Sequence, residues 1–433
     1  MTVAAVRLWG RRIGAVAIGS GETAAVFEYD PDFARSGIEI SPLTLPLRPG
    51  RRSFPELPRE TFHGLPGLLA DSLPDRFGAA LITAWLNAEG REAGSFDAVE
   101  RLCYLGTRGL GALEFAPATG PAAPRGAPLE IGGLVRLASL VLSRKSALAG
   151  SLADGESSAA LQQILLVGTS AGGARAKAVI AWNPTTNDVR SGQADAGPGF
   201  EHWLLKFDGV EDDRGQELSS PRGYGAIELA YARMAIAAGI AMAECRILEE
   251  GGRRHFMTRR FDRTATGAKV HMQTLGSLAH FDYNQAGAHS YEQALLVIRQ
   301  LGLGMEAREE QFRRMAFNVI ARNQDDHVKN ISFLMSQDGR WTLSPAYDLT
   351  YANTPANRWI GQHQMTVNGK RDDFEVADFR SVAAAASLRR GRAEGILAEV
   401  RDAVLGWREH AHAAGVGEQR AEQIAAAHRL ALR

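Results

Sequence analysis

A cluster of ionisable and amide side chains stands in the segment ARNQDDHVKNISFL, residues 321–334, directly before an apolar, strand-like run. The cluster contains Asp325 and, five residues later, Asn330. Phosphoryl transfer requires two kinds of group from a protein. One is a carboxylate that accepts a hydroxyl proton, and the other is a set of oxygen ligands that hold a metal at the phosphate groups. A solvated loop is the alternative reading of this segment taken alone.

A turn sequence follows the cluster. Asp338-Gly339 lies between two apolar runs and predicts a β-hairpin. Folding the hairpin would bring Asn330 and Asp348 to the same end, where an amide oxygen and a carboxylate suit Mg²⁺. Protein kinases have an aspartate base, a metal-binding asparagine five residues later and a second metal-binding aspartate after a short hairpin. The hairpin and Asp348 therefore favour phosphoryl transfer over a solvated loop.

Cationic residues near these groups have two interpretations each. His327 and Lys329 either neutralise phosphate charge or pack the loop. In TSAGGARAK, residues 169–177, the small residues Gly172 and Gly173 would let backbone N–H groups approach phosphate oxygens, and Lys177 would add a charge. The segment lacks the glycine spacing and the Ser/Thr of a Walker A loop, and an ordinary hairpin turn is the alternative.

Lys206 is the other candidate phosphate ligand. It lies in HWLLKFD, which reads as a strand with the lysine in its middle, and we expect its side chain to be buried. A strand lysine that faces a cleft suits an α/β-phosphate clamp, whereas a snorkelling edge-strand lysine is the alternative. Glu228, on the following predicted helix, is a candidate ion-pair partner for it.

The elements that position these residues follow from local patterns. Strands are expected at 4–10, 12–20, 23–30, 165–168, 177–182 and 201–208, helices at 75–86, 133–144, 224–240 and 378–433, and a hairpin that turns at Gly251-Gly252. Residues 116–128 are rich in Pro, Ala and Gly and predict a linker. The result is an α+β fold with a small β-rich N-terminal subdomain (1–115), a linker (116–130), a β-rich nucleotide-binding lobe (131–265) and a helical catalytic lobe (266–433).

The overall composition is that of a globular protein. Hydrophobic residues make up 45% and charged residues 23% of 433 residues, and the formal net charge is zero. This balance gives no support for a nucleic-acid or membrane partner. Cys103 and Cys245 are far apart and predict neither a disulfide framework nor a structural zinc. With no long apolar run, the expectation is a cytoplasmic protein.

The segments SAGGARAK, RRFDR, NQDDHVKN and SPAYDL occur in this order, preceded by SPLTLPLRPG, FHGLPGLLADSLPDRFG and GTRGLGALEF. In this combination the chain resembles, over nearly its full length, the HipA family of serine/threonine kinases. These kinases are the toxins of bacterial type II toxin–antitoxin modules. The resemblance implies a two-lobed, protein-kinase-like fold, with ATP and Mg²⁺ as cofactors. It also implies a HipB-like helix-turn-helix antitoxin as partner, with operator DNA reached through it, and a protein substrate such as an aminoacyl-tRNA synthetase.

The resemblance also implies roles for residues of this chain. Asp325 would be the catalytic base, Asn330 and Asp348 the magnesium ligands, and Ser170 the serine whose autophosphorylation silences the kinase. Beside bound ATP a phosphoserine would be repelled, which gives that silencing a physical basis. The implied nucleotide contacts come from the loop at 172–177, one strand and the catalytic segment: Gly172, Gly173, Lys177, Lys206, Arg259, Phe261, His327, Lys329, Asn330, Tyr347 and Asp348. Of these, the strand from Arg259 to Phe261 would contact adenine through its backbone.

Two positions depart from the family pattern, which often has glutamate at 259 and glycine at 326. Backbone contacts survive Arg259, whereas Asp326 is expected to add a negative charge beside the base that raises its pKa or repels phosphate. Two other functions remain open. One is a pseudokinase that binds an antitoxin and tunes repression, and the other is a small-molecule kinase.

Overall fold

The computed structural model describes residues 1–121, 126, 128–142, 163–168, 175–211, 217–220 and 223–432. The chain divides into two compact units that alternate along the sequence. The first unit comprises residues 1–39, 47–225 and 245–272, and the second comprises residues 40–46, 226–244 and 273–433. The N-terminal region and the β-rich middle region therefore form one unit, whereas most of the helix at 224–237 belongs with the C-terminal helices.

The first unit begins with a five-stranded antiparallel sheet in the order β4-β3-β2-β1-β5. Its strands and the helices near it are β1 (Thr2–Leu8), β2 (Arg11–Ile18), β3 (Val26–Tyr29), α1 (Pro31–Ala34), β4 (Arg51–Arg52), α2 (Arg59–Phe62), α3 (Gly67–Ala70), α4 (Arg76–Ala88), the 3-10 helix η1 (Ala93–Ser95), α5 (Ala98–Leu105) and β5 (Leu113–Ala116). Helix α5 starts with a capping box, in which Asp97 and Glu100 each accept the other's backbone N–H.

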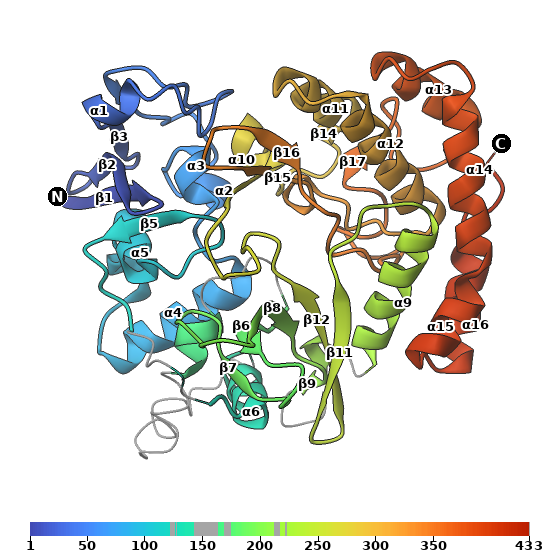
Figure 1. The fold of residues 1–433 in the computed structure, drawn as a ribbon, viewed down its shortest axis with the longest axis horizontal. Coiled ribbons are helices and arrows are strands. Elements are labelled where there is room, and N and C mark those ends of the chain that lie inside the picture. The colour runs from blue at the N-terminus through green and yellow to red at the C-terminus, as the bar shows by residue number, and fades with distance from the viewer. Residues whose placement is uncertain are drawn as a thin grey trace. The chain divides into compact units, whose positions relative to one another are not determined.

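A second five-stranded antiparallel sheet follows in the order β11-β12-β8-β6-β7, and Figure 1 shows β8, β12 and β11 side by side. The elements of this part are α6 (Ile131–Leu142), β6 (Lys177–Trp182), β7 (Val189–Ser191), β8 (Glu201–Lys206), β9 (Val210–Glu211), β10 (Glu217–Ser220), β11 (Cys245–Glu250) and β12 (Arg253–Arg259). Side chains of α4, α6 and residues 163–168 pack with those of β6, β8 and β12 in one apolar core.

A buried ion cluster links the two sheet regions within the first unit. The Asp262 carboxylate accepts the Gly111 N–H at 2.7 Å and two bonds from Arg260, at 2.8 and 2.6 Å. Arg263 donates to the same carboxylate at 2.8 Å. Burial alone would raise the pKa of Asp262, but the two guanidinium groups outweigh it and hold the pKa well below its usual range. The RRFDR segment thus has a structural role here.

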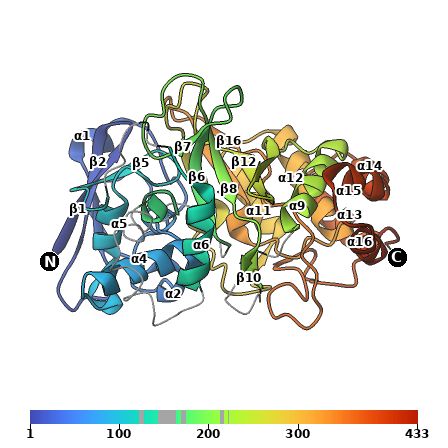
Figure 2. The same ribbon diagram turned by 90° about the horizontal axis from the view of Figure 1, so that it is seen from below.

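The second unit is mainly helical. Its elements are α9 (Tyr224–Ala237), β13 (His271–Thr274), α10 (Leu275–Ala279), β14 (His289–Ser290), α11 (Tyr291–Gln300), α12 (Met305–Ile320), the 3-10 helix η2 (Val328–Asn330), β15 (Ser332–Met335), β16 (Trp341–Leu343), β17 (Met365–Thr366), α13 (Val376–Ala385), α14 (Arg392–Leu405), α15 (Trp407–Ala414) and α16 (Glu418–Ala427). Strands β13, β15 and β16 form a three-stranded sheet. Helices α13–α16 lie together, as both Figure 1 and Figure 2 show.

Helix α9 is attached to this unit through buried aromatic side chains. The Tyr231 hydroxyl donates to the Ala321 carbonyl at 2.6 Å, at the C-terminal end of α12. The Tyr231 ring also lies 5.2 Å from Trp407 of α15. A helix that follows a strand of the first unit in sequence therefore packs in the core of the second.

Most of the predicted elements are confirmed, including the N-terminal strands, the helix that begins after Asp75 and the hairpin at Gly251-Gly252. The predicted α+β class is also confirmed. The strand predicted at 165–168 is wrong, since residues 163–168 are helical. Four consecutive apolar residues are compatible with a buried helix as well as with a buried strand, and periodicity alone does not separate the two. Part of the predicted linker lies outside the described residues.

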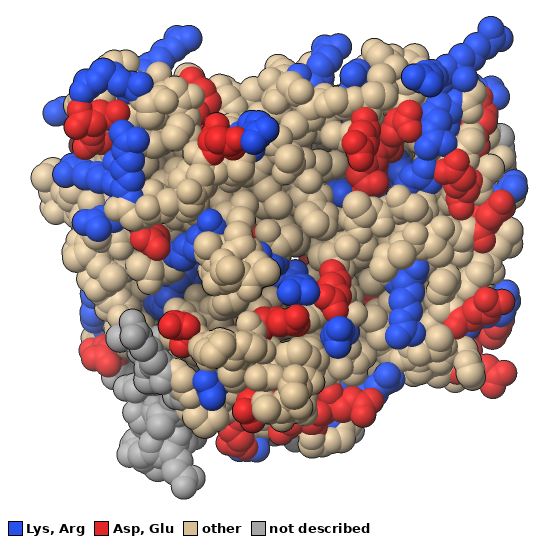
Figure 3. All heavy atoms as spheres, viewed as in Figure 1, with Lys and Arg blue, Asp and Glu red and all other residues tan. Residues whose placement is uncertain are grey.

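The surface carries charges of both signs. In Figure 3 the Lys and Arg side chains lie among Asp and Glu side chains over the visible face, in keeping with a net charge of zero. Within the described ranges, none of the helices combines the length and the apolar character needed to span a bilayer.

Candidate functional site

The segment with the clustered polar residues begins where α12 ends. Arg322 adopts a left-handed conformation with φ 58°, which terminates the helix, and the Asn323 N–H returns to the Asn318 carbonyl at 2.9 Å. The Gln324 N–H donates to Ala352 O at 3.0 Å, and the Ala352 N–H donates to Arg322 O at 3.1 Å. The start of the loop is therefore held by α12 on one side and by residue 352 on the other.

Asp325 and Asn330 are joined directly. The Asn330 Nδ2 donates to the Asp325 carbonyl oxygen at 2.8 Å, and the Asn330 N–H donates to His327 O at 2.9 Å. With Nδ2 engaged, the Asn330 Oδ1 is the amide atom suited to a cation. The Asp325 side chain is 48% exposed, so its carboxylate is accessible to a substrate hydroxyl. The loop has the geometry expected for a base and a metal ligand at this spacing.

The predicted hairpin is confirmed. Strands β15 and β16 pair from Phe333–Leu343 to Met335–Trp341, with Gly339 at φ 82° in the turn. At the open end, the Tyr347 hydroxyl donates to Lys329 O at 2.6 Å and lies 2.5 Å from Ser332 Oγ. Because Lys329 and Tyr347 directly precede Asn330 and Asp348, the two candidate metal ligands are at the same end of the hairpin.

Two further features fix that end. Arg314 of α12 donates to Ser344 O at 2.8 Å and to Glu310 at 2.7 Å, so the strand after the turn is anchored to the helix. Asp348 has φ 56°, a left-handed conformation in which aspartate is several-fold enriched over most other residues. Such backbone conformations cluster at functional sites.

Asp326, which we expected to add a negative charge beside the base, has a buried carboxylate that accepts bonds from Tyr291 Oη at 2.7 Å, His363 Nδ1 at 2.8 Å and the Gln364 N–H at 2.7 Å. Burial alone would raise the pKa of Asp326, but His363 and these donors lower it. The side chain of Asp325 is half-exposed, whereas that of Asp326 is enclosed.

His327 and Lys329 gather around one aromatic ring. The Lys329 Nζ lies 4.9 Å from the centroid of the Tyr283 ring, and the His327 ring lies 6.1 Å from it. His327 Nε2 is 3.9 Å from Asp325 Oδ1. Both cationic candidates are thus close to the loop that carries Asp325, where they could contact phosphate oxygens. Tyr283 was not singled out from the sequence, and nothing in its local pattern identified it.

Asn330 and Asp348 fit a magnesium ion of the kind that substrate phosphates help to hold. Mg²⁺ keeps several waters and is bound through one or two carboxylates together with phosphate oxygens. In the ranges that the structure describes, three or more His, Cys, Asp or Glu side chains nowhere gather in an arrangement suited to a metal. One amide oxygen and one carboxylate therefore suit a shared site better than a preformed, all-protein one.

In the first unit, Lys177 and Lys206 are directly opposite each other. Lys177 is the first residue of β6 and Lys206 is the last of β8, and the antiparallel register pairs them. Their exposed fractions are 3% and 7%, as expected for Lys206. Its predicted position in mid-strand is wrong, because β8 ends at this residue. Residues in this register have their side chains on the same face of the sheet.

The structure describes only some of the remaining candidate site residues. Strand β12 ends at Arg259, whose guanidinium lies 3.3 Å from Glu201 Oε1. The predicted strand from Arg259 to Phe261 is thus too long. The Arg260 N–H still bonds to His202 O at 2.9 Å, while Phe261 is in a turn. Ser170, Gly172 and Gly173 lie outside the described residues. Glu228 is buried in α9.

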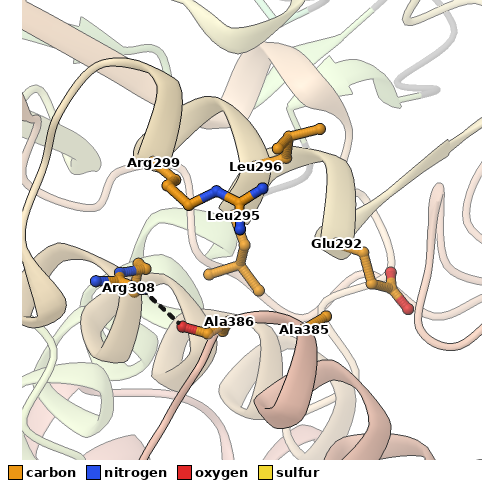
Figure 4. Close-up of a pocket in the computed structure, with 7 residues that line it drawn as sticks. All are labelled: Glu292, Leu295, Leu296, Arg299, Arg308, Ala385 and Ala386. Carbon is orange, nitrogen blue, oxygen red and sulfur yellow. Dashed lines mark hydrogen bonds between the residues drawn. The ribbon is translucent and has the colours of Figure 1, made fainter.

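Two cavities occur in the second unit. One of about 20 Å³ has Asn318, Asp326 and Asn330 in its wall. The other, of about 160 Å³, is shown in Figure 4 among residues of α11, α12 and the end of α13, where Arg308 donates to Ala386 O at 3.0 Å. Both are smaller than the roughly 300 Å³ at which ligand pockets usually begin. The second contains none of the predicted site residues.

Comparisons with known proteins identify the family. The family model of the HipA-like C-terminal domain matches residues 169–408, and that of the HipA N-terminal domain matches residues 4–116. The curated proteins contain no match to the sequence.

Among solved structures, the chain is similar to one of the HipA, HipB and operator DNA complex of the Shewanella oneidensis MR-1 toxin–antitoxin system. That match has a TM-score of 0.67 at 16% identity and covers 98% of this chain and 94% of the other. A second match, to the Helicobacter pylori proinflammatory kinase CtkA, has a TM-score of 0.33 at 12% identity and covers 52% and 92% of the two chains. The two family models together span most of the sequence, and the chain belongs to the HipA family.

Proposed function

We propose that the chain is an ATP-dependent serine/threonine protein kinase. The observation that carries the proposal is the arrangement of the catalytic loop, in which Asn330 bonds to the Asp325 carbonyl while the Lys329–Tyr347 bond brings Asp348 to the same end of the hairpin. This arrangement presents an accessible carboxylate and two oxygen ligands from one anchored segment. Membership in the HipA family supports the same chemistry.

In the proposed reaction, Asp325 accepts the proton of a serine or threonine hydroxyl while the hydroxyl oxygen bonds to the γ-phosphorus of ATP. The bond from that phosphorus to the β–γ bridging oxygen breaks, and ADP leaves. Asn330 Oδ1 and the Asp348 carboxylate hold Mg²⁺, which when bound neutralises charge that develops on the phosphates. Lys329 adds positive charge next to the base, and His327 could contact phosphate oxygens there.

Lys177 and Lys206 would bind phosphates of the nucleotide. They are paired across β6 and β8, so two cationic side chains project from the same face of the sheet. The segment that contains Gly172 and Gly173 directly precedes β6, and its backbone would add N–H donors to the same phosphates. Backbone groups from Arg259 to Phe261 are the proposed adenine contacts.

We further propose that the kinase is the toxin of a toxin–antitoxin pair. The Shewanella oneidensis structure contains HipA together with HipB and operator DNA. By this likeness, the partner of the present chain is a HipB-like helix-turn-helix protein, and DNA is reached through that partner. The substrate is a protein, for which an aminoacyl-tRNA synthetase is the first candidate to test, and Ser170 is the site of silencing autophosphorylation.

The test is incorporation of labelled phosphate from magnesium-ATP by the purified protein, with Asp325→Gln and Ser170→Ala in parallel. Label on the wild type that is absent from both variants supports a kinase that modifies Ser170. If label persists in Ser170→Ala but not in Asp325→Gln, the protein is a kinase whose acceptor is a residue other than Ser170.

Binding of ATP without any incorporation, also when the antitoxin and candidate substrates are added, would contradict the kinase and favour an antitoxin-binding pseudokinase. Phosphorylation of a small molecule in place of protein would favour the small-molecule alternative. If ATP does not bind at all, the assignment of the nucleotide residues is wrong.

A further inference from the structure

The buried carboxylate of Asp326 is the end point of a chain of hydrogen bonds inside the second unit. Asn323 Nδ2 donates to Asn318 Oδ1 at 2.9 Å, and Asn318 Nδ2 donates to Tyr291 Oη at 2.9 Å. The Tyr291 hydroxyl then donates to Asp326 at 2.7 Å. Each donor in this series points toward Asp326, so the series is complete only when Asp326 Oδ2 is an acceptor.

A second branch reaches Asp326 from the C-terminal segment. Arg429 Nη1 lies 2.9 Å from His363 Nε2, and a guanidinium can only donate. His363 Nε2 must therefore be the acceptor, which leaves the ring proton on Nδ1, 2.8 Å from the Asp326 carboxylate. Arg429 also bonds to Asp372, while its N–H donates to Ile320 O at 2.9 Å. The branch thus spans from the end of α12 to the loop.

The position of Asp326 makes this network relevant to the candidate site. It directly follows Asp325, and its carboxylate is fully enclosed while that of Asp325 is half-exposed. The side chain of residue 326 is fixed inward by three donors, and the side chain of residue 325, next to it in the chain, faces solvent. The Asp325 carbonyl is held separately by Asn330, so the loop is fixed at two neighbouring points.

We propose that Asp326 is a positioning residue which, through Tyr291 on one side and His363 with Arg429 on the other, holds Asp325 in its outward orientation. The proposal rests on the kinase function proposed above for Asp325. An amide at 326 could not replace the carboxylate, because in either orientation its Nδ2 donor would face another donor: the Gln364 N–H in one, and Tyr291 and His363 in the other. Supporting groups of this kind typically affect activity by about 10- to 100-fold.

Asp326→Asn tests the proposal, with Asp378→Asn as its matched control. Asp378 is a comparably buried carboxylate in the same unit and accepts bonds from Asn368, Lys370 and the Glu375 N–H, away from the loop. Amide hydrogen exchange over residues 321–331, kcat and KM for ATP, and the melting temperature are measured for both variants.

We expect Asp326→Asn to accelerate exchange in residues 321–331 at least tenfold and to lower kcat by about 10- to 100-fold, with KM for ATP changed less than about threefold. Asp378→Asn should lower the melting temperature while leaving loop exchange and kcat unchanged. If both variants lose stability alike and neither changes loop exchange or kcat, the network is structural only and the proposal is overturned.

Milder variants keep the test decisive if Asp326→Asn does not fold. Arg429→Met removes the hydrogen bond that His363 accepts, and Tyr291→Phe removes one of the hydrogen bonds that Asp326 accepts. Each should therefore give a smaller increase in loop exchange and a smaller fall in kcat. Unchanged loop exchange in both would overturn the proposal. The exchange measurement needs no activity. A wild type without phosphoryl transfer would therefore contradict the proposed kinase, while exchange alone would decide whether Asp326 orders the loop.

Discussion

The two regions that carry the candidate residues are held in place by different means. In the first unit, Lys177 and Lys206 are brought together by backbone pairing, since the antiparallel register of β6 and β8 sets them opposite each other. In the second unit, Asp325 and Asn330 lie on a loop whose start pairs with Ala352 through the backbone and which is held further along by the side chains of Asn330 and Asp326. The sheet thus positions the two lysines, and side-chain bonds help to position the proposed proton acceptor.

This difference predicts different consequences of substitution. A lysine at the end of a buried strand can be replaced without displacing the strand, because the backbone bonds remain. The expected effect is then confined to binding of an anion. A loop that depends on a few buried polar contacts loses its geometry when one of them is removed. The expected effect there is on the chemical step.

Asp348→Asn should have the largest effect among the substitutions that test this contrast. It removes the carboxylate of the proposed magnesium site, and metal stabilisation of a transition state is worth several kcal/mol, so kcat should fall by about 1,000-fold. Steady-state kinetics at varied Mg²⁺ measures it. Asp338→Asn, an exposed aspartate in the turn of the same hairpin, is the control and should retain wild-type rates. Equal rates in both variants would remove Asp348 from the metal site.

Lys206→Met should act on binding. Loss of a charge-assisted bond to phosphate costs about 1.5–3 kcal/mol, so KM for ATP should rise by about 10- to 100-fold with a smaller change in kcat. Lys177→Met and the double variant complete a cycle, and directly opposed residues should show coupling of about 0.5–3 kcal/mol. Strictly additive changes in binding would mean that the two lysines contact different groups. A fall in kcat alone would contradict the assignment of the sheet to binding.

The smallest predicted effect concerns stability of the first unit. His255 Nδ1 accepts the Asp208 N–H at 3.0 Å, and burial lowers the pKa of His255 to about 4. Because the folded pKa lies below the ordinary value, the unfolded chain takes up the proton first, and stability is lost as the pH falls from about 6.5 toward 4. Between pH 6.5 and 5.5, the wild type should lose on the order of 1 kcal/mol relative to His255→Asn. Denaturant unfolding at several pH values checks this. The same dependence of the unfolding free energy on pH in the wild type and in His255→Asn would contradict it.

The sequence was sufficient where local chemistry decides structure. Asp338-Gly339 and Gly251-Gly252 specify turns, because glycine tolerates positive φ, and both predicted hairpins are present. Since the hairpin length follows from the turn, the proximity of Asn330 and Asp348 followed as well. Burial of Lys206 was also predictable from its apolar neighbours.

The sequence was insufficient where contacts join distant segments. Asp326 is hydrogen-bonded to Tyr291 and His363, which are 35 and 37 residues away in the sequence, and His363 is hydrogen-bonded to Arg429, which is 66 residues away. No periodicity or turn signal reports such pairs, so the buried partners of Asp326 could not be predicted. The strand prediction for the apolar run at 165–168 was wrong for a different reason, because a run of this length fits a helix as well as a strand.

The most direct test of the account is to measure, on Asp325→Asn, the affinity for magnesium-ATP and the rate of phosphoryl transfer in the same preparation. Loss of a general base costs about 100- to 10,000-fold in rate, whereas the bonds to nucleotide and metal do not involve the Asp325 side chain. We therefore expect an affinity for magnesium-ATP within about threefold of the wild type and a rate of phosphoryl transfer lower by about 100- to 10,000-fold. Transfer at the wild-type rate would contradict the assignment of Asp325 as the base, and with it the proposed mechanism.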